Sequence, residues 1–199
     1  PELVATAKEL DMPAIAITDH GALYGIVDFY EECKKQGIKP IIGIETYVAP
    51  NLSKENEGVR EYSHLILLAK NNTGLKNLMK LSTLAFTKGF YYKPRIDYDL
   101  LEQYSEGLIC QSACLAGDIP TYLLNNQYED AKALATRLKG IFGDDFYIEI
   151  QNHGIAEELV VLPRLVSLAR ELDIKLIATN DIHYVNKEDA KYQDILLCV

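Results

Sequence analysis

Apolar residues recur along this chain with two different spacings, and segments of the two kinds alternate. Short, almost continuous apolar runs predict buried strands at residues 14–18, 40–48, 64–69, 107–111, 146–150 and 175–179. Apolar residues three or four positions apart predict helices at residues 2–10, 22–36, 74–86, 128–141, 157–172 and 187–197. Residues 51–61 are polar and predict a loop. Alternating strands and helices indicate a parallel sheet with crossover helices, and so the α/β class.

Residue types that bind metals gather at the ends of these predicted strands. They are His20, Glu45, His64, Asp181 and His183, with Cys114 and His153 just past two further strands. In a barrel, the carboxyl ends of all strands meet at one rim, where several side chains can bind a cluster of metal ions. His64 precedes its strand, and an antiparallel hairpin of 45–48 and 64–69 would bring it to the same rim.

Most of these residues also have an ordinary structural interpretation. Asp19 could cap the helix predicted from residue 22, which would leave His20 as a loop residue. Cys114 could be a small core residue, and with Cys110 it forms only a single C-x₃-C pair, a weak zinc signal. Glu45 is harder to explain in this way. A carboxylate within an apolar strand is costly to bury without a cation or another partner.

The remaining candidates leave the same choice open. Asp181 and His183 lie two positions apart and so share one side of an extended segment, but they could also form a hydrogen-bonded pair in a loop. His153 could be a turn residue. Each structural interpretation is reasonable alone. That all of them are true together is a weaker hypothesis than one metal cluster that explains every position.

Composition narrows the classes of function. The 199 residues are 48% hydrophobic, which is typical of one globular domain. The sequence contains neither a run of about 18 apolar residues nor a signal peptide, so we expect no membrane association. Four cysteines are too few for a secreted disulfide scaffold and favour the cytoplasm. A net charge of −9 argues against a broad phosphate-binding surface, although metal ions can supply positive charge locally.

Five sequence motifs resemble one known family. They are ITDHGALYG (17–25), KPIIGIETYVAP (39–50), GFYYKPRID (89–97), SACLAG (112–117) and ATNDIHY (178–184). They resemble the amino-terminal PHP domain (polymerase and histidinol phosphatase) of bacterial DNA polymerase III alpha subunits, over essentially the whole chain. The resemblance implies a distorted (β/α)7-type PHP barrel, with residues 1–199 as a single PHP domain fragment of a larger multidomain polymerase subunit.

The resemblance also implies a metal site. The implied ligands are His20, Glu45, His64, Cys114, Asp181 and His183. The intact domain would hold up to three ions of Zn²⁺ or Mn²⁺. The family's first strand, with its His-x-His motif, is missing ahead of Pro1. We therefore expect a barrel truncated at the N-terminus that binds about one ion, through Glu45, His64 and Cys114. Asp19 and His153 are candidates for supporting catalysis beside the ligands.

By the same resemblance, the parent protein is a DNA-directed DNA polymerase with a metal-dependent 3′–5′ exonuclease that can proofread, and the isolated fragment is inactive. Its partners would be the primer 3′ end and the other domains and subunits of the replicative polymerase. Lys93 and Arg95 lie in a stretch of basic and aromatic residues, which is typical of surfaces that bind single strands. Alternatively, this stretch packs its tyrosines on the barrel and contacts neighbouring domains.

Two other functions stay open. One is a stand-alone PHP phosphoesterase, although such enzymes usually carry histidine at the position of Cys114. The other is a non-catalytic scaffold that stabilises the polymerase or docks a proofreading subunit.

Overall fold

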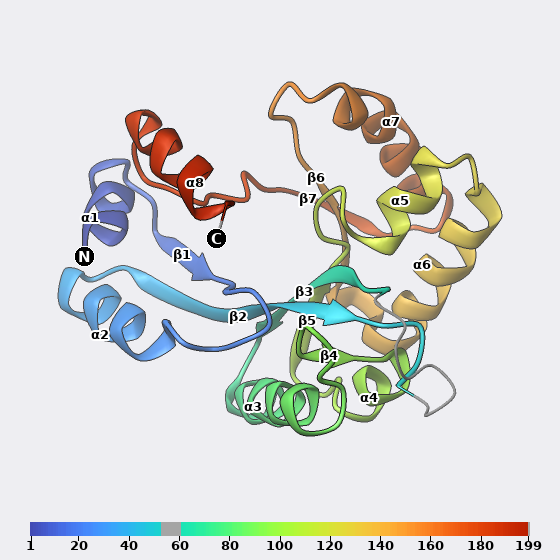
Figure 1. Cartoon of the computed structure of the whole chain (residues 1–199), viewed down its shortest axis with the longest axis horizontal. Coiled ribbons are helices and arrows are strands. Elements are labelled where there is room, and N and C mark those ends of the chain that lie inside the picture. The colour runs from blue at the N-terminus through green and yellow to red at the C-terminus, as the bar shows by residue number, and fades with distance from the viewer. Residues whose placement is uncertain (53–60, 199) are drawn as a thin grey trace.

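One curled sheet organises the molecule. The computed structural model describes residues 1–52 and 61–198. Within them, six strands follow the order β1-β2-β3-β5-β6-β7, and β4 pairs with β2 off this path (Figure 1). The strands are β1 (Ala14–Ile17), β2 (Lys39–Val48), β3 (Ser63–Ala69), β4 (Arg95–Ile96), β5 (Leu108–Gln111), β6 (Phe146–Ile150) and β7 (Lys175–Ala178). Because β1 and β7 are the two ends of this order, the sheet is an open half-barrel of the α/β class.

The strands are not all parallel, and this corrects the simplest expectation from strand–helix alternation. The pairs β1–β2, β5–β6 and β6–β7 are parallel, whereas β2–β3 and β3–β5 are antiparallel. The predicted hairpin of β2 and β3 is confirmed. The sequence between the two strands predicts a loop, and antiparallel strands need no crossover helix.

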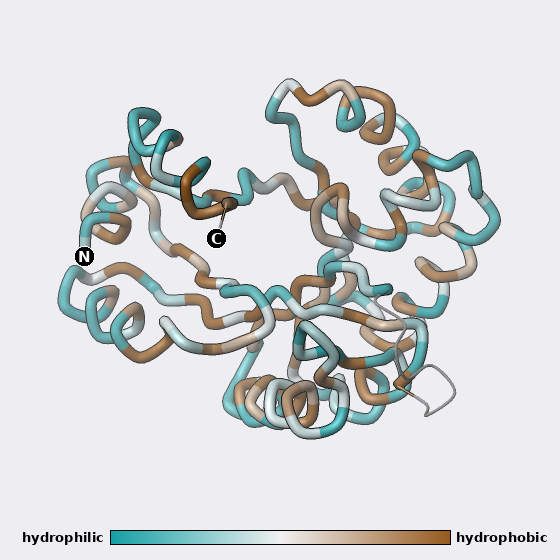
Figure 2. Tube along the Cα trace, in the orientation of Figure 1, coloured by the Kyte–Doolittle hydropathy of each residue, from teal (hydrophilic) through white to brown (hydrophobic). Residues whose placement is uncertain are grey.

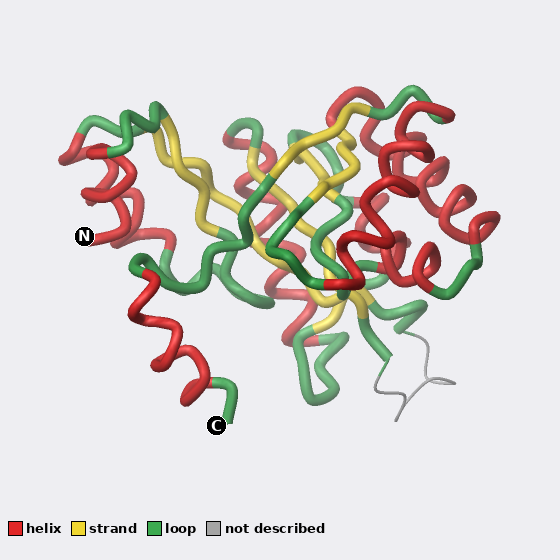
Figure 3. Tube along the Cα trace, turned by 90° about the horizontal axis from the view of Figure 1, so that it is seen from above, coloured by secondary structure: helices red, strands yellow, loops and turns green. Residues whose placement is uncertain are grey.

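Helices surround the sheet at either end of the molecule (Figure 3). They are α1 (Glu2–Glu9), α2 (Ile26–Gln36), α3 (Asn72–Thr87), α4 (Tyr98–Gln103), α5 (Asp118–Leu124), α6 (Tyr128–Phe142), α7 (Ala156–Glu171) and α8 (Ala190–Leu196). The expected bounds are wrong at two helices: α2 begins at residue 26 rather than 22, and the last helix begins with a separate 3-10 turn, Lys187–Asp189. The short elements β4, α4 and α5 were not expected.

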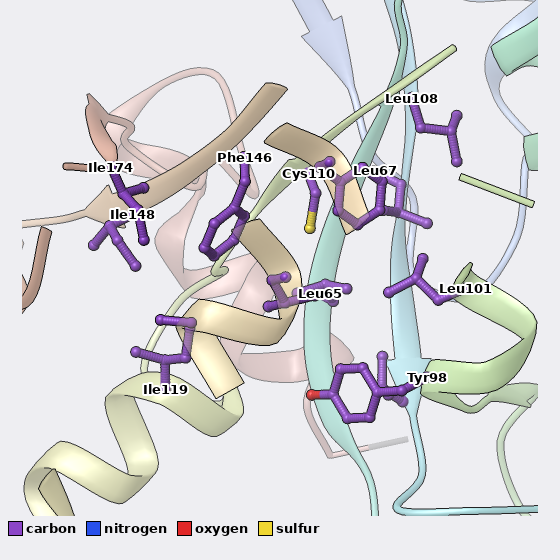
Figure 4. Close-up of a cluster of buried hydrophobic side chains, with 14 of the residues drawn as sticks. Leu65, Leu67, Tyr98, Leu101, Leu108, Cys110, Ile119, Phe146, Ile148 and Ile174 are labelled. Atoms are coloured by element: carbon purple, nitrogen blue, oxygen red, sulfur yellow. The ribbon is translucent and has the colours of Figure 1, made fainter. Parts of the chain in front are cut away.

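The main core lies on the outer face of the sheet. Figure 4 shows side chains of β3, β5 and β6 meeting those of α4 and α5. The labelled residues on these elements are Leu65, Leu67, Tyr98, Leu101, Leu108, Cys110, Ile119, Phe146 and Ile148. Figure 2 shows apolar residues along the strands and on parts of the surrounding helices. A smaller cluster, centred on Phe29 and Cys33, joins α1 and α2 to β1. A third cluster, centred on Ile66 and Leu68, lies on the opposite face of the sheet, which also bears Glu45.

The chain after β7 returns toward the first helix. The side-chain Nδ2 of Asn186 donates a hydrogen bond to Glu2 Oε1 over 2.8 Å, which joins the segment before α8 to the start of α1. This return carries residues 179–184 past the end of the sheet that bears His20. Among the described helices, none is long and apolar enough to cross a membrane.

Candidate metal centre

Glu45 is the central residue of the site. It lies in β2 between Ile44 and Thr46, and only 4% of its surface is exposed. Glu45 Oε2 lies 3.3 Å from His20 Nδ1, and Oε1 lies 2.6 Å from His64 Nδ1. The ligand atoms of these three residues all lie within 4.8 Å of one another. One buried carboxylate between two imidazoles is a donor set that Zn²⁺ and Mn²⁺ both accept.

Backbone hydrogen bonds hold His20 in this position. Past the end of β1, the chain continues beside β2, and His20 forms a parallel bridge with Glu45. The amide of Gly21 donates to the Glu45 carbonyl over 2.8 Å, and the amide of Glu45 donates to the Asp19 carbonyl over 3.1 Å. His20 is therefore fixed by the strand next to it, while 45% of its side chain stays exposed. This exposure leaves one side of the site open to a ligand from solvent.

His64 approaches Glu45 from the neighbouring strand. It is near the start of β3, opposite Tyr47 of β2, and its amide donates to the Ala116 carbonyl. Burial acts to lower the pKa of His64, but Cys114 and Glu45 outweigh burial and raise the pKa to about 9. The imidazole therefore carries a proton at neutral pH. A cation must displace that proton, so its binding weakens as the pH falls.

Cys114 completes the group from the loop after β5. Its sulfur lies 3.9 Å from His64 Nδ1 and 4.0 Å from Glu45 Oε1. The structure thus brings together Glu45, His64 and Cys114, the three residues expected to hold one ion. A thiol beside nitrogen and oxygen donors favours Zn²⁺ over Mg²⁺.

Asp181 and His183 reach the site from the segment after β7. The ring of His183 lies 5.8 Å from the ring of His20. His183 Nδ1 donates to the Asp181 carbonyl over 2.8 Å, and the Asp181 carboxylate lies 3.9 Å from the same nitrogen. Asp181 has a left-handed backbone, with a φ of 45°. The pair lies beside the group of His20, Glu45 and His64 without belonging to it, and its role as ligands stays a prediction.

Asp19 and His153 have local partners of their own. Asp19 Oδ2 accepts a hydrogen bond of 2.8 Å from the amide of Gly25, the residue that precedes α2. His153 Nδ1 lies 2.6 Å from Glu158 Oε1, and Nε2 lies 2.8 Å from the Asn180 carbonyl. The partnership with Glu158, together with the Asn180 carbonyl, raises the pKa of His153. Both ring nitrogens are engaged, so the geometry gives His153 no direct part in the metal group.

Lys93 and Arg95 occupy different environments. Lys93 Nζ lies 5.5 Å from the ring centre of Tyr47, close to the histidines. Arg95 is buried in β4, where its Nε donates to the Gly89 carbonyl over 3.2 Å and its guanidinium lies over Tyr91. Of the two, Lys93 is the better placed to meet a substrate at the metal group.

Two features of the site were not expected from the sequence. The rings of Tyr47 and Tyr62 pack against His64, with Tyr62 stacked at an interplanar angle of 6°. Glu149 lies in β6 with 5% of its surface exposed. A sequence signal for Glu149 exists, since it is a carboxylate within the apolar run FYIEI, as Glu45 is within its own strand.

Comparison with known proteins gives the class of the molecule. A family model described as "PHP domain" matches residues 1–153, which is most of the chain. The chain therefore belongs to the PHP domain family.

The most informative relatives are polymerase subunits. The chain is 53% identical to the DNA polymerase III subunit alpha of Borreliella burgdorferi and 47% identical to that of Aquifex aeolicus. Each alignment covers 100% of this chain but only 18% of the relative. The chain thus spans less than a fifth of the length of these relatives. Among solved structures, an amidohydrolase from Chromobacterium violaceum matches with a TM-score of 0.55 at 12% identity, over 91% of this chain and 81% of that one. At this identity, the match indicates a shared fold alone.

Proposed function

We propose that this chain is the metal-binding PHP domain of a replicative DNA polymerase alpha subunit and that, within the whole subunit, this domain hydrolyses DNA from the 3′ end. The observation that carries the proposal is the group of His20, Glu45 and His64, with Cys114 within 4.0 Å of Glu45. Similarity to DNA polymerase III alpha subunits over the whole chain supports DNA as the substrate.

In this proposal, the residues of the site have the following roles. Glu45, His20, His64 and Cys114 hold the ion, and Asp181 and His183 extend the site from the other end of the sheet. A bound divalent ion lowers the pKa of a water molecule and neutralises phosphate charge. Lys93, beside Tyr47, is placed to attract the phosphate backbone. Tyr62, which is 41% exposed and stacked on His64, offers a surface for a terminal base.

The negative net charge of the chain is consistent with these roles. With a net charge of −9, the protein surface repels nucleic acid, so the attraction has to come from bound cations and from a few basic side chains at the site. We further propose that the partners are the primer 3′ end and the other regions of the polymerase, in the cytoplasm, and that polymerisation itself takes place outside this chain.

Replacing Asp181 by Asn in the polymerase subunit tests this function. We expect 3′-end trimming to fall at least about 100-fold, because a ligating carboxylate is lost, whereas primer extension should change little because it uses a separate site. A 5′-labelled single strand with Mn²⁺ or Zn²⁺ reports trimming, and a primed template reports extension. Asp99→Asn is the control, since Asp99 lies on the surface, where it forms an ion pair with Arg137.

Equal loss of both activities would mean that Asp181 acts on folding. A parent subunit that binds metal without trimming DNA would contradict hydrolysis and favour the non-catalytic scaffold.

A further inference from the structure

Glu149 lies on the same face of the sheet as the metal group. Residues directly opposite each other on paired strands share a face, and the pairings run from Glu45 to Ile66, then Gln111, then Tyr147. Glu149 follows Tyr147 by two residues and therefore lies on this face as well. Its neighbour Ile148 points the other way, into the main core.

The Glu149 carboxylate is incompletely paired. Its Oε1 accepts hydrogen bonds from Thr179 and from Gln151 Nε2, the latter over 3.1 Å. Its Oε2 is buried and accepts no hydrogen bond. Within residues 1–52 and 61–198, it is the one buried side-chain nitrogen or oxygen that has no hydrogen-bond partner. Buried polar atoms are nearly always hydrogen-bonded, so an exception calls for an explanation.

Negative charge accumulates around this atom. Burial raises the pKa of Glu149, and the charges of Asp181 and Glu45 raise it further, against the hydrogen bonds from Thr179 and Gln151. In the described part of the chain, no lysine or arginine forms an ion pair with any of these three carboxylates. A buried group of this kind is costly unless a cation is present.

Glu149 and Cys114 line the same small cavity. Its polar lining is Cys114, Glu149, Gln151 and Glu158, and the rest is apolar. The Glu158 carboxylate is already held by the ring and the amide of His153. Cys114, in contrast, lies between the cavity and the metal group, since it lines the cavity and its sulfur also approaches Glu45 and His64.

We propose that this cavity binds a divalent cation through the Glu149 carboxylate and the Cys114 sulfur, and that Cys114 is shared between this ion and the ion held by His20, Glu45 and His64. The thiol makes Zn²⁺ the expected ion. The inference rests on the metal-binding part of the proposed function, and it adds Glu149 to the residues that act on metal.

Zinc binding by the metal-free chain tests the inference. Glu149→Gln keeps the shape of the side chain and removes its charge. We expect this variant to retain fewer zinc ions per chain than the parent after gel filtration, and to bind zinc in the cavity at least about tenfold more weakly in a calorimetric titration. Glu158→Gln, which changes the other carboxylate of the cavity, should bind zinc as the parent does.

Thermal unfolding gives a second readout. Without metal, Glu149→Gln should unfold at the same temperature as the parent or higher, because a buried negative charge is gone; with zinc, its rise in unfolding temperature should be smaller. Glu149→Asp keeps the charge but moves the carboxylate back by one methylene group, so it should also bind zinc more weakly. This second variant keeps the test valid if Glu149→Gln does not fold.

The possible failures are distinguishable. If Glu149→Gln binds as much zinc as the parent, with the same affinity, the cavity site is wrong and the main metal group stands. If the parent itself binds no zinc, both the inference and the proposed function are overturned.

Discussion

Replacing Glu45 by Gln should abolish tight metal binding at the group of His20, Glu45 and His64. The Glu45 carboxylate lies within 4.0 Å of His20 Nδ1, His64 Nδ1 and the Cys114 sulfur, so it joins the other three residues of the site. An amide keeps the shape of the side chain but lacks the negative charge that binds a cation. We expect the affinity for Zn²⁺ or Mn²⁺ to fall at least about 100-fold. Calorimetric titration of the metal-free protein measures this change.

Glu158→Gln is a closely matched control. Glu158 is 3% exposed and lies 2.6 Å from His153 Nδ1, which repeats the geometry of Glu45 and His64. Each substitution breaks one buried charge-assisted hydrogen bond, so each should lower the free energy of unfolding by about 1–3 kcal/mol. Only Glu45→Gln should remove the metal-induced rise in unfolding temperature. Similar metal binding in the two variants would show that Glu45 pairs with histidine for structural reasons alone.

Gly74→Ala should have the largest effect on stability. Gly74 lies in the first turn of α3, and its amide donates to the side chain of Asn71, which caps the helix. A Cβ atom at Gly74 would lie 1.9 Å from the Gly107 carbonyl oxygen, where α3 meets the start of β5. Two backbone segments would have to separate, and we expect the free energy of unfolding to fall by about 3 kcal/mol or more. Urea denaturation followed by circular dichroism measures it.

Gly140→Ala makes the same chemical change where there is room. Gly140 is exposed in α6, and nothing lies within 4 Å of the position that a methyl group would occupy there. Alanine favours a helix over glycine, so stability should rise by about 0.5–1 kcal/mol. If Gly74→Ala and Gly140→Ala destabilise the protein to a similar extent, the short distance between residue 74 and the Gly107 carbonyl does not explain why residue 74 is glycine.

The sequence was most informative where one local feature decides the structure. Apolar runs located the six long strands, and the position of His64 before its strand led to the predicted hairpin of β2 and β3. Glu45 stood out because burying a carboxylate is costly, and it is indeed 4% exposed. The short α4 and α5, of six and seven residues, were missed because they contain too few turns for helical spacing to show.

Features that depend on contacts between distant segments could not be predicted. The sequence of β6 is compatible with Glu149 facing solvent, and only the register with β5 turns it to the inner face. The partners of His153, at residues 158 and 180, and the burial of Arg95 also follow from tertiary packing.

Anomalous diffraction from crystals soaked in Mn²⁺ or Zn²⁺ would test the central claim most directly. We expect a peak between His20, Glu45 and His64, within about 2.0–2.3 Å of the ligand atoms. Ordered side chains at these positions, with no peak at any of them while metal binds elsewhere on the protein, would contradict the claim.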